Sequence, residues 1–212
     1  LEYCLQVLWP ELNVNVQSVT DQWAGIAVAG PNARTLLQRL FPDADLSGDA
    51  FPFMAAGTFA LAGIEARLFR ISFSGELGYE LNVPADYGAA AAQRLLDLGG
   101  NLGADLYGLE ALDIMRIEKG HVTGNELDGR VTAQDLGMAR MLSSKKDYIG
   151  GRLSQRAAFL DAERPQLVGL KPTDPTRKAT AGAHLMPQGG PDDPENDLGW
   201  VSSATWSPTL ES

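Results

Sequence analysis

Two stretches of the sequence contain side chains whose types and spacing could support chemistry. In RISFSGELGYELNV, residues 70–83, Glu80 lies on an expected strand among aromatic residues. Side chains alternate between the two faces of a strand, so Glu80 should face away from Tyr79 and Leu81. A buried carboxylate needs a partner, because an isolated charge is costly in a low-dielectric environment. Two interpretations are open: Glu80 forms a cross-strand ion pair with Arg70, or it accepts hydrogen bonds from the two-donor edge of a flat heterocycle that stacks on an aromatic residue.

The second stretch, GLEALDIMRIEKGHVTGNELDG at residues 108–129, combines an expected helix with an irregular loop. Apolar and charged positions are interleaved around the whole helix, which indicates burial on more than one side. The charged positions then need structural partners; they are Glu110, Asp113, Arg116 and Glu118. Glu118 is expected either to be buried with a partner or to lie on a solvated face. The loop GNELDGR, at 124–130, has turn chemistry and could line a cleft.

Several common catalytic and metal-binding patterns are absent from the sequence. It contains no GxGxxG after an expected strand, no GxxxxGK phosphate loop and no GxSxG elbow. His121 and His184 lie far apart, and Cys4 is the single cysteine. We therefore predict no metal site and no disulfide within the chain. A single cysteine suits a reducing compartment, so we expect a cytoplasmic protein.

The charge and hydropathy of the chain argue against two further classes of partner. The chain has 212 residues, with 27 acidic and 17 basic side chains and a formal net charge of −10. This charge would repel phosphate backbones, so nucleic acid is not an expected partner. No apolar run approaches the ~20 residues that a bilayer-spanning helix requires, so no membrane span is expected.

The elements that position the first stretch are expected within residues 1–100, where the pattern predicts an α+β sandwich. Strands are expected in VNVQSV and WAGIAVAG within 13–29, in GTFALAG and IEARLFRISF about a turn at Gly63, and in GYELNV. Helices are expected from Pro31 and in the alanine-rich segment 85–100. This order indicates a ferredoxin-like antiparallel sheet with helices on one face.

Two further segments follow the expected sandwich. Residues 101–163 are predicted to form a mostly helical and loop segment that covers another domain. Residues 164–212 contain the runs QLVGLKP, AGAHLMP and GWVSSATW, which indicate short strands at the start of a β-barrel. Three short strands cannot close a barrel or bury both of their faces. We therefore expect a truncated barrel and a chain that is a piece of a longer polypeptide.

Five motifs carry a resemblance to a known family. They are QWAGIAVAGPNAR at 22–34, RISFSGELGYE at 70–80, GLEALDIMRIEKGHVTGNELDGR at 108–130, KKDYIGGR at 145–152 and GWVSSATWSPTL at 199–210. In this order they resemble the glycine-cleavage T-protein (aminomethyltransferase) superfamily. Within it, the sequence is most similar to the carboxyl-terminal part of the α subunits of heterotetrameric sarcosine oxidases, and GNELDGR favours that branch over T-proteins proper.

The resemblance implies a tetrahydrofolate-binding domain in a one-carbon-transfer enzyme. In the sarcosine oxidase branch, folate accepts the one-carbon unit released by flavin-dependent demethylation of sarcosine, which gives 5,10-methylenetetrahydrofolate. FAD, FMN and NAD would be bound elsewhere in the full complex, so the implied partners of this chain are reduced folate and the other sarcosine oxidase subunits. Two alternatives stay open: an aminomethyltransferase proper, and a non-catalytic folate-binding or assembly module.

The resemblance also assigns binding residues within the first stretch. Glu80 matches the family glutamate that accepts the amino and ring N–H donors of the pterin. Phe73 matches the aromatic residue that contacts the folate ring, without the tyrosine hydroxyl common there, and Arg70 and Tyr79 complete the predicted cofactor-binding residues. Leu112 stands where T-proteins have an arginine that assists folate binding. The family's catalytic aspartate lies amino-terminal to this chain, so we predict no catalytic residue here and little activity from this piece alone.

Overall fold

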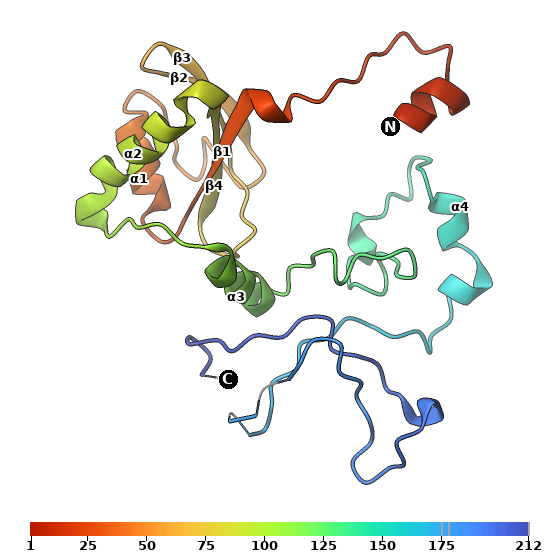
Figure 1. Cartoon of the computed structure of the whole chain (residues 1–212). Helices are drawn as coiled ribbons and strands as arrows, with labels where there is room; N and C mark the ends of the chain where they lie inside the picture. The colour runs from red at the N-terminus through yellow and green to blue at the C-terminus, as the bar shows by residue number, and fades with distance from the viewer. Residues whose placement is uncertain (175, 178, 212) are drawn as a thin grey trace. The chain divides into compact units, whose positions relative to one another are not determined.

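The computed structural model describes residues 1–174, 176–177 and 179–211. The chain divides into two compact units, Leu1–Tyr107 and Gly108–Ser212. The first unit contains the sheet and two helices, whereas the second consists mainly of loops and short helices (Figure 1). In the described part of the chain, no helix has the length and apolarity needed to cross a lipid bilayer.

The first unit is built on a four-stranded antiparallel sheet with the strand order β1-β4-β3-β2. Its strands are β1 (Trp23–Ala29), β2 (Ala56–Leu61), β3 (Ile64–Phe69) and β4 (Gly78–Pro84). Helix α1 (Ala33–Leu40) lies between β1 and β2 in the chain, and α2 (Gly88–Gly99) follows β4. The predicted α+β class with an antiparallel sheet is therefore confirmed.

The connectivity of this sheet is not ferredoxin-like, so that part of the prediction is wrong. The observed order is βαβββα, whereas a ferredoxin-like unit has the order βαββαβ. The difference arises after β3, because residues 70–77 form a short link directly into β4 instead of a crossover helix. Strand β4 then pairs with both β3 and β1, which places it inside the sheet.

The hydrophobic core lies between one face of the sheet and both helices. Alternate residues of three strands face the helices: Val28 of β1, Ala66 and Leu68 of β3, and Tyr79, Leu81 and Val83 of β4. They pack against Leu36, Leu37 and Leu40 of α1 and against Ala91 and Leu95 of α2. The opposite, outer face of the sheet carries no helix of this unit, so the prediction of helices on one face is confirmed.

One expected strand is absent and another is shorter than expected. Residues 14–19, VNVQSV, form no strand, and no neighbouring strand pairs with their backbone groups. Strand β3 ends at Phe69, four residues before the end of the expected run. The hairpin between β2 and β3 does turn at the expected place, where Ala62 and Gly63 have φ angles of 50° and 90°. Two consecutive positive φ angles are typical of a tight two-residue hairpin turn.

The second unit contains α3 (Leu109–Lys119) and the single-turn helix α4 (Gly151–Ser154). Helix α3 ends at Lys119. The N–H of the next residue, Gly120, donates to the Ile117 carbonyl at 3.0 Å, and the φ of 77° at Gly120 lets the N–H of His121 donate to the Arg116 carbonyl at 2.8 Å. The rest of the described chain in this unit consists of turns and short 3₁₀ segments. The predicted barrel strands are not confirmed: one isolated antiparallel bridge, His184 to Trp200, joins two of the three expected runs. The three-part division at residues 100 and 163 stays a prediction.

A buried charged network holds the second unit together around Arg116. Its side chain contacts Asp113 (Nε to Oδ1, 2.7 Å), Glu126 (Nη1 to Oε2, 3.3 Å) and Ser203 (Nη2 to Oγ, 2.8 Å). Ser203 in turn donates to Glu126 at 2.6 Å, and Thr123 donates its backbone N–H to the same carboxylate at 2.8 Å. Burial tends to raise the pKa of the Glu126 carboxyl, but these hydrogen bonds hold it below its usual range.

The residue of α3 that requires buried partners is therefore Arg116 rather than Glu118. Arg116 is 3% exposed, whereas Glu118 is exposed and accepts a hydrogen bond from the Ser207 hydroxyl. The interleaved pattern identified a helix with several buried sides. It did not determine which charge faces inward, because that choice depends on where residues 126 and 203 are placed by the rest of the chain.

A second ion pair in this unit makes its stability dependent on pH. Arg164 contacts both oxygens of Asp135 at 3.0 and 2.6 Å, and this contact lowers the pKa of Asp135 to about 2. Because the carboxyl pKa is lower in the folded state, its contribution is present above about pH 4 and is lost as the pH falls towards 2. We expect Asp135→Asn to remove about 2 kcal/mol of pH-dependent stability between pH 6 and pH 2.

Urea unfolding at a series of pH values measures this effect as the difference between wild type and variant. Asp128→Asn is the matched control, since Asp128 pairs with a largely exposed Arg130 and is expected to change the profile much less. Parallel pH profiles of the wild type and Asp135→Asn would contradict the assignment.

Candidate functional site

Glu80 lies in the middle of β4 on the outer face of the sheet. In the register of the strands, Ala27 of β1 stands on one side of it and Phe69 of β3 on the other. The residue is exposed, and its carboxylate has no hydrogen bond or ion pair with any described residue. The ion-pair interpretation is therefore wrong, because Arg70 instead donates from Nη1 to the carbonyl of Gly78 at 2.9 Å.

Arg70 and Tyr79 lie together on the other side of the sheet from Glu80. Tyr79 is 1% exposed, and its hydroxyl accepts a hydrogen bond from Arg34 Nε at 2.9 Å. The guanidinium carbon of Arg70 lies 5.0 Å from the Tyr79 ring centroid. Alternation along β4 turns Tyr79 into the core whenever Glu80 points outwards. The structure therefore does not place Tyr79 on the surface that presents Glu80.

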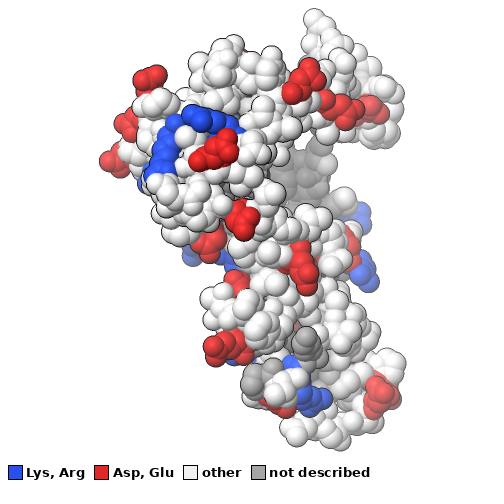
Figure 2. Space-filling view, turned by 60° about the vertical axis from the view of Figure 1, so that its left-hand side comes forward, with Lys and Arg blue, Asp and Glu red and all other residues white. Residues whose placement is uncertain are grey.

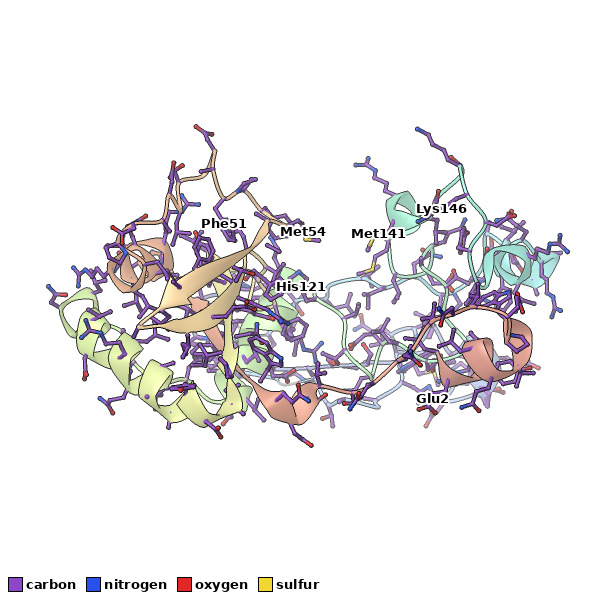
Figure 3. All side chains as sticks on the ribbon, turned by 90° about the horizontal axis from the view of Figure 1, so that it is seen from above. Glu2, Phe51, Met54, His121, Met141 and Lys146 are labelled. Atoms are coloured by element: carbon purple, nitrogen blue, oxygen red, sulfur yellow. The ribbon has the colours of Figure 1, made fainter. Side chains whose placement is uncertain are left out.

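Arg70 also supports an exposed loop next to the sheet. Met54 donates its backbone N–H to the Arg70 carbonyl at 2.9 Å and has a φ of 71°, an uncommon value for a residue with a side chain. Phe51 packs into the core, whereas Met54 is 70% exposed at the edge of the unit (Figure 3). Arg70 thus organises a loop and the start of β4, which is a structural role that its sequence context did not reveal.

Phe73 lies in the link between β3 and β4 and is 41% exposed. Two serine side chains stabilise the link. The Ser72 hydroxyl accepts from the backbone N–H of Gly75 at 3.1 Å, and the Ser74 hydroxyl accepts from the backbone N–H of Glu76 at 3.3 Å. These turns keep the ring of Phe73 at the surface. Its predicted contact with a folate ring stays a prediction.

Sequence reasoning placed Asn82 on the same face as Glu80 but missed the neighbours that the other strands contribute. Asn82 stands beside Glu80 on β4, opposite Gly25 of β1. Further along, Arg67 lies over the Trp23 ring at 3.8 Å from its centroid and pairs with Glu65 at 3.3 Å. Alternation alone places Asn82 on the face of Glu80. The neighbours from β1 could not be found in this way, because the pairing of β1 with β4 joins segments about 50 residues apart.

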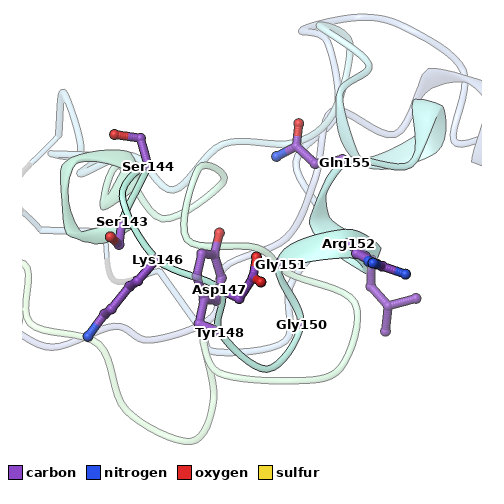
Figure 4. A pocket seen from close by; sticks show the side chains of 10 residues that line it. Ser143, Ser144, Lys146, Asp147, Tyr148, Gly150, Gly151, Arg152 and Gln155 are labelled. Atoms are coloured by element: carbon purple, nitrogen blue, oxygen red, sulfur yellow. The ribbon is translucent and has the colours of Figure 1, made fainter.

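An open hollow in the second unit is a weaker candidate for a ligand site. Its volume is about 590 Å³, and it is formed by residues between Ser143 and Gln155 (Figure 4). Lys146 and Arg152 point to different sides of it in Figure 4. Two cationic groups that diverge in this way do not form a convergent set for one small anion, so the hollow does not define a ligand.

Acidic residues are the most abundant charged groups, but they are not gathered into a cation site. Asp and Glu side chains form separate small groups over the face shown in Figure 2. Within the described residues, no group of three or more His, Cys, Asp or Glu side chains is placed to hold a metal ion.

Comparison with known proteins supplies the family. Residues 2–146 match the family described as the GCVT N-terminal domain. The chain belongs to the GCVT N-terminal domain family. The matched range contains the whole sheet, both helices that cover it and the complete 70–83 stretch, so the resemblance to the T-protein superfamily is confirmed.

Curated relatives of this GCVT-family chain include sarcosine oxidase subunits, dimethylglycine dehydrogenases and aminomethyltransferases. The sarcosine oxidase subunit alpha of Rhizobium meliloti (strain 1021) is 48% identical over 215 residues, which cover 100% of this chain and 22% of that protein. The mitochondrial dimethylglycine dehydrogenase of Mus musculus is 34% identical over 65% of this chain and 16% of that protein. The aminomethyltransferase of Pseudothermotoga lettingae is 28% identical over 95% of this chain and 52% of that protein. The chain therefore spans about a fifth of the length of the sarcosine oxidase subunit that it matches.

Proposed function

We propose that this GCVT-family chain binds reduced folate through the outer face of its sheet, as the folate module of a one-carbon-transfer enzyme of the sarcosine oxidase type. The observation that carries the proposal is the Glu80 carboxylate, which is exposed and has no partner among the described residues. It stands on a sheet face that no helix of its unit covers. A carboxylate placed in this way is available to a ligand rather than used by the fold.

The surroundings of Glu80 suit a pterin. The amino group and the adjacent ring N–H of a pterin are parallel donors, and the two oxygens of one carboxylate can accept both. Ala27, on β1, is small and leaves room above the strand, while Phe69 offers an aromatic side chain from β3. Phe73, at the surface of the nearby link, is our second candidate for contact with the ring.

The residues of this chain are proposed to bind and orient the folate and not to carry out the chemistry. Tetrahydrofolate, when bound, supplies the amines that accept a one-carbon unit, with 5,10-methylenetetrahydrofolate as the proposed product. Sarcosine is the proposed source of that unit, since the sarcosine oxidase subunit has a higher identity to this chain than the aminomethyltransferase and matches its full length. The flavin and nicotinamide cofactors and the other subunits are proposed to act elsewhere in the enzyme, in the cytoplasm.

Calorimetric titration with a stable reduced folate, 5-formyltetrahydrofolate, tests the proposal. We expect Glu80→Gln to weaken binding about thirtyfold or more, which corresponds to about 2 kcal/mol. The substitution keeps the size of the side chain but places an amide donor against a ligand donor. Glu65→Gln is the matched control, because Glu65 lies on the same sheet face but pairs with Arg67, and we expect it to bind as the wild type does. Equal affinities of Glu80→Gln and the wild type would exclude this site.

A further inference from the structure

We propose that Asn82 is a second ligand-binding residue of the same site. Its side-chain amide contacts the ring substituent, an oxygen or an amino group, that lies next to the N–H donors bound by Glu80. For a reduced folate, this substituent is the 4-oxo group of the pterin. The inference rests on the proposed function, and it adds a second residue that hydrogen-bonds to the heterocycle.

The geometry places the two side chains next to each other. Glu80 and Asn82 are two residues apart on one strand, so they project from the same face at a spacing of about 7 Å between their α-carbons. The Asn82 amide, like the Glu80 carboxylate, has no hydrogen bond with any described residue. Both side chains lie on a sheet face that no helix of their unit covers, so their hydrogen-bonding groups are available to one ligand.

The residue opposite Asn82 keeps this part of the face open. Gly25 of β1 pairs with Asn82, and a β-carbon at that position would lie 3.2 Å from Asn82 Oδ1. Gly25 and Ala27, which stand opposite Asn82 and Glu80, are both small residues on the β1 side of the site. A flat ring can therefore approach Glu80 and Asn82 from the β1 side, and Arg67 of β3, which pairs with Asn82 and reaches the Trp23 ring of β1, borders the site at its other end.

The chemistry of the two side chains complements one edge of a 2-amino-4-oxo heterocycle. The Glu80 carboxylate accepts from the two donors, and the Asn82 amide donates its N–H to the neighbouring oxo group. A 4-amino ring has no hydrogen on N3, so it can donate to Glu80 only from its 2-amino group, but the asparagine amide can rotate and present its oxygen to the 4-amino group. Asn82 is therefore expected to tolerate either substituent, whereas an aspartate in its place can only accept hydrogen bonds.

This difference defines an experiment with two ligands, tetrahydrofolate and its 4-amino counterpart, titrated calorimetrically. We expect Asn82→Asp to lower the affinity for the 4-oxo ligand at least about tenfold and to change the affinity for the 4-amino ligand by less than about threefold. We expect Asn82→Leu, which can form neither hydrogen bond, to weaken both ligands by similar factors. Asn13→Asp adds the same charge at an exposed position outside the sheet and should leave both affinities unchanged.

The outcomes separate this inference from the function on which it rests. If Glu80→Gln weakens binding of the 4-oxo ligand but Asn82→Asp weakens binding of both ligands equally, or of neither, Asn82 does not contact the substituent and the inference is wrong while the folate site stands. If Glu80→Gln leaves the affinity for the 4-oxo ligand unchanged, the folate site itself is wrong. Thermal unfolding of each variant checks that it is folded, and little change is expected because Asn82 lies on the face outside the core.

Discussion

Arg116→Met is expected to destabilise the second unit by about 3 to 5 kcal/mol, the largest single effect that the structure implies. Methionine has a side chain of similar length but no charge. The substitution therefore leaves the Glu126 carboxylate, which is 7% exposed, without its cationic partner. An unpaired buried charge costs more than the pair contributes, because its desolvation is no longer offset. The loss extends to Ser203, whose hydroxyl bridges the two charged groups.

Hydrogen exchange across a urea titration measures this effect in peptides from residues 108–130. Arg140→Met is the control, since Arg140 is exposed and a change below about 0.5 kcal/mol is expected there. The double variant Arg116→Met with Glu126→Leu removes both charges and is expected to recover part of the loss. A single variant within about 1 kcal/mol of the wild type would show that the network contributes little.

Leu68→Ala is expected to destabilise the first unit by about 2 to 5 kcal/mol, whereas Phe69→Ala, one residue later, is expected to cost less than about 1 kcal/mol. Leu68 is 0% exposed among the helices and strands of the core. Phe69 lies on the outer face beside Glu80 and is half-buried. Removing its ring leaves no closed cavity, because no helix of the unit covers that face.

The same exchange measurement, read in peptides from residues 64–84, compares the two variants directly. The loss of stability should be larger for Leu68→Ala although Phe69→Ala removes the larger side chain. Equal losses would indicate that both sheet faces are covered, and the outer face would then not be open to a ligand. Phe69→Ala is also expected to weaken reduced-folate binding, since it removes aromatic contact area next to Glu80.

The residues around Glu80 illustrate how much local spacing can predict. Alternation along GYELNV places Glu80 and Asn82 opposite Tyr79 and Leu81, and the structure has this arrangement. The hairpin turn at Gly63 and the two helices were also predictable from short sequence patterns. These features follow from the two-residue repeat of a strand, the 3.6-residue repeat of a helix and the φ angles that each residue type allows.

By itself, the sequence determined the α+β class, the family and the opposition of Glu80 and Tyr79. Only the tertiary structure decided that the helices cover the Tyr79 side, that Arg70 binds a backbone carbonyl rather than Glu80, and that Arg116 is the buried charge of α3. Alternation distinguishes two faces of a strand but not which of them is buried. That choice depends on contacts between segments far apart in the chain, such as β1 with β4 and residue 116 with residue 203, whose free energy no local pattern contains.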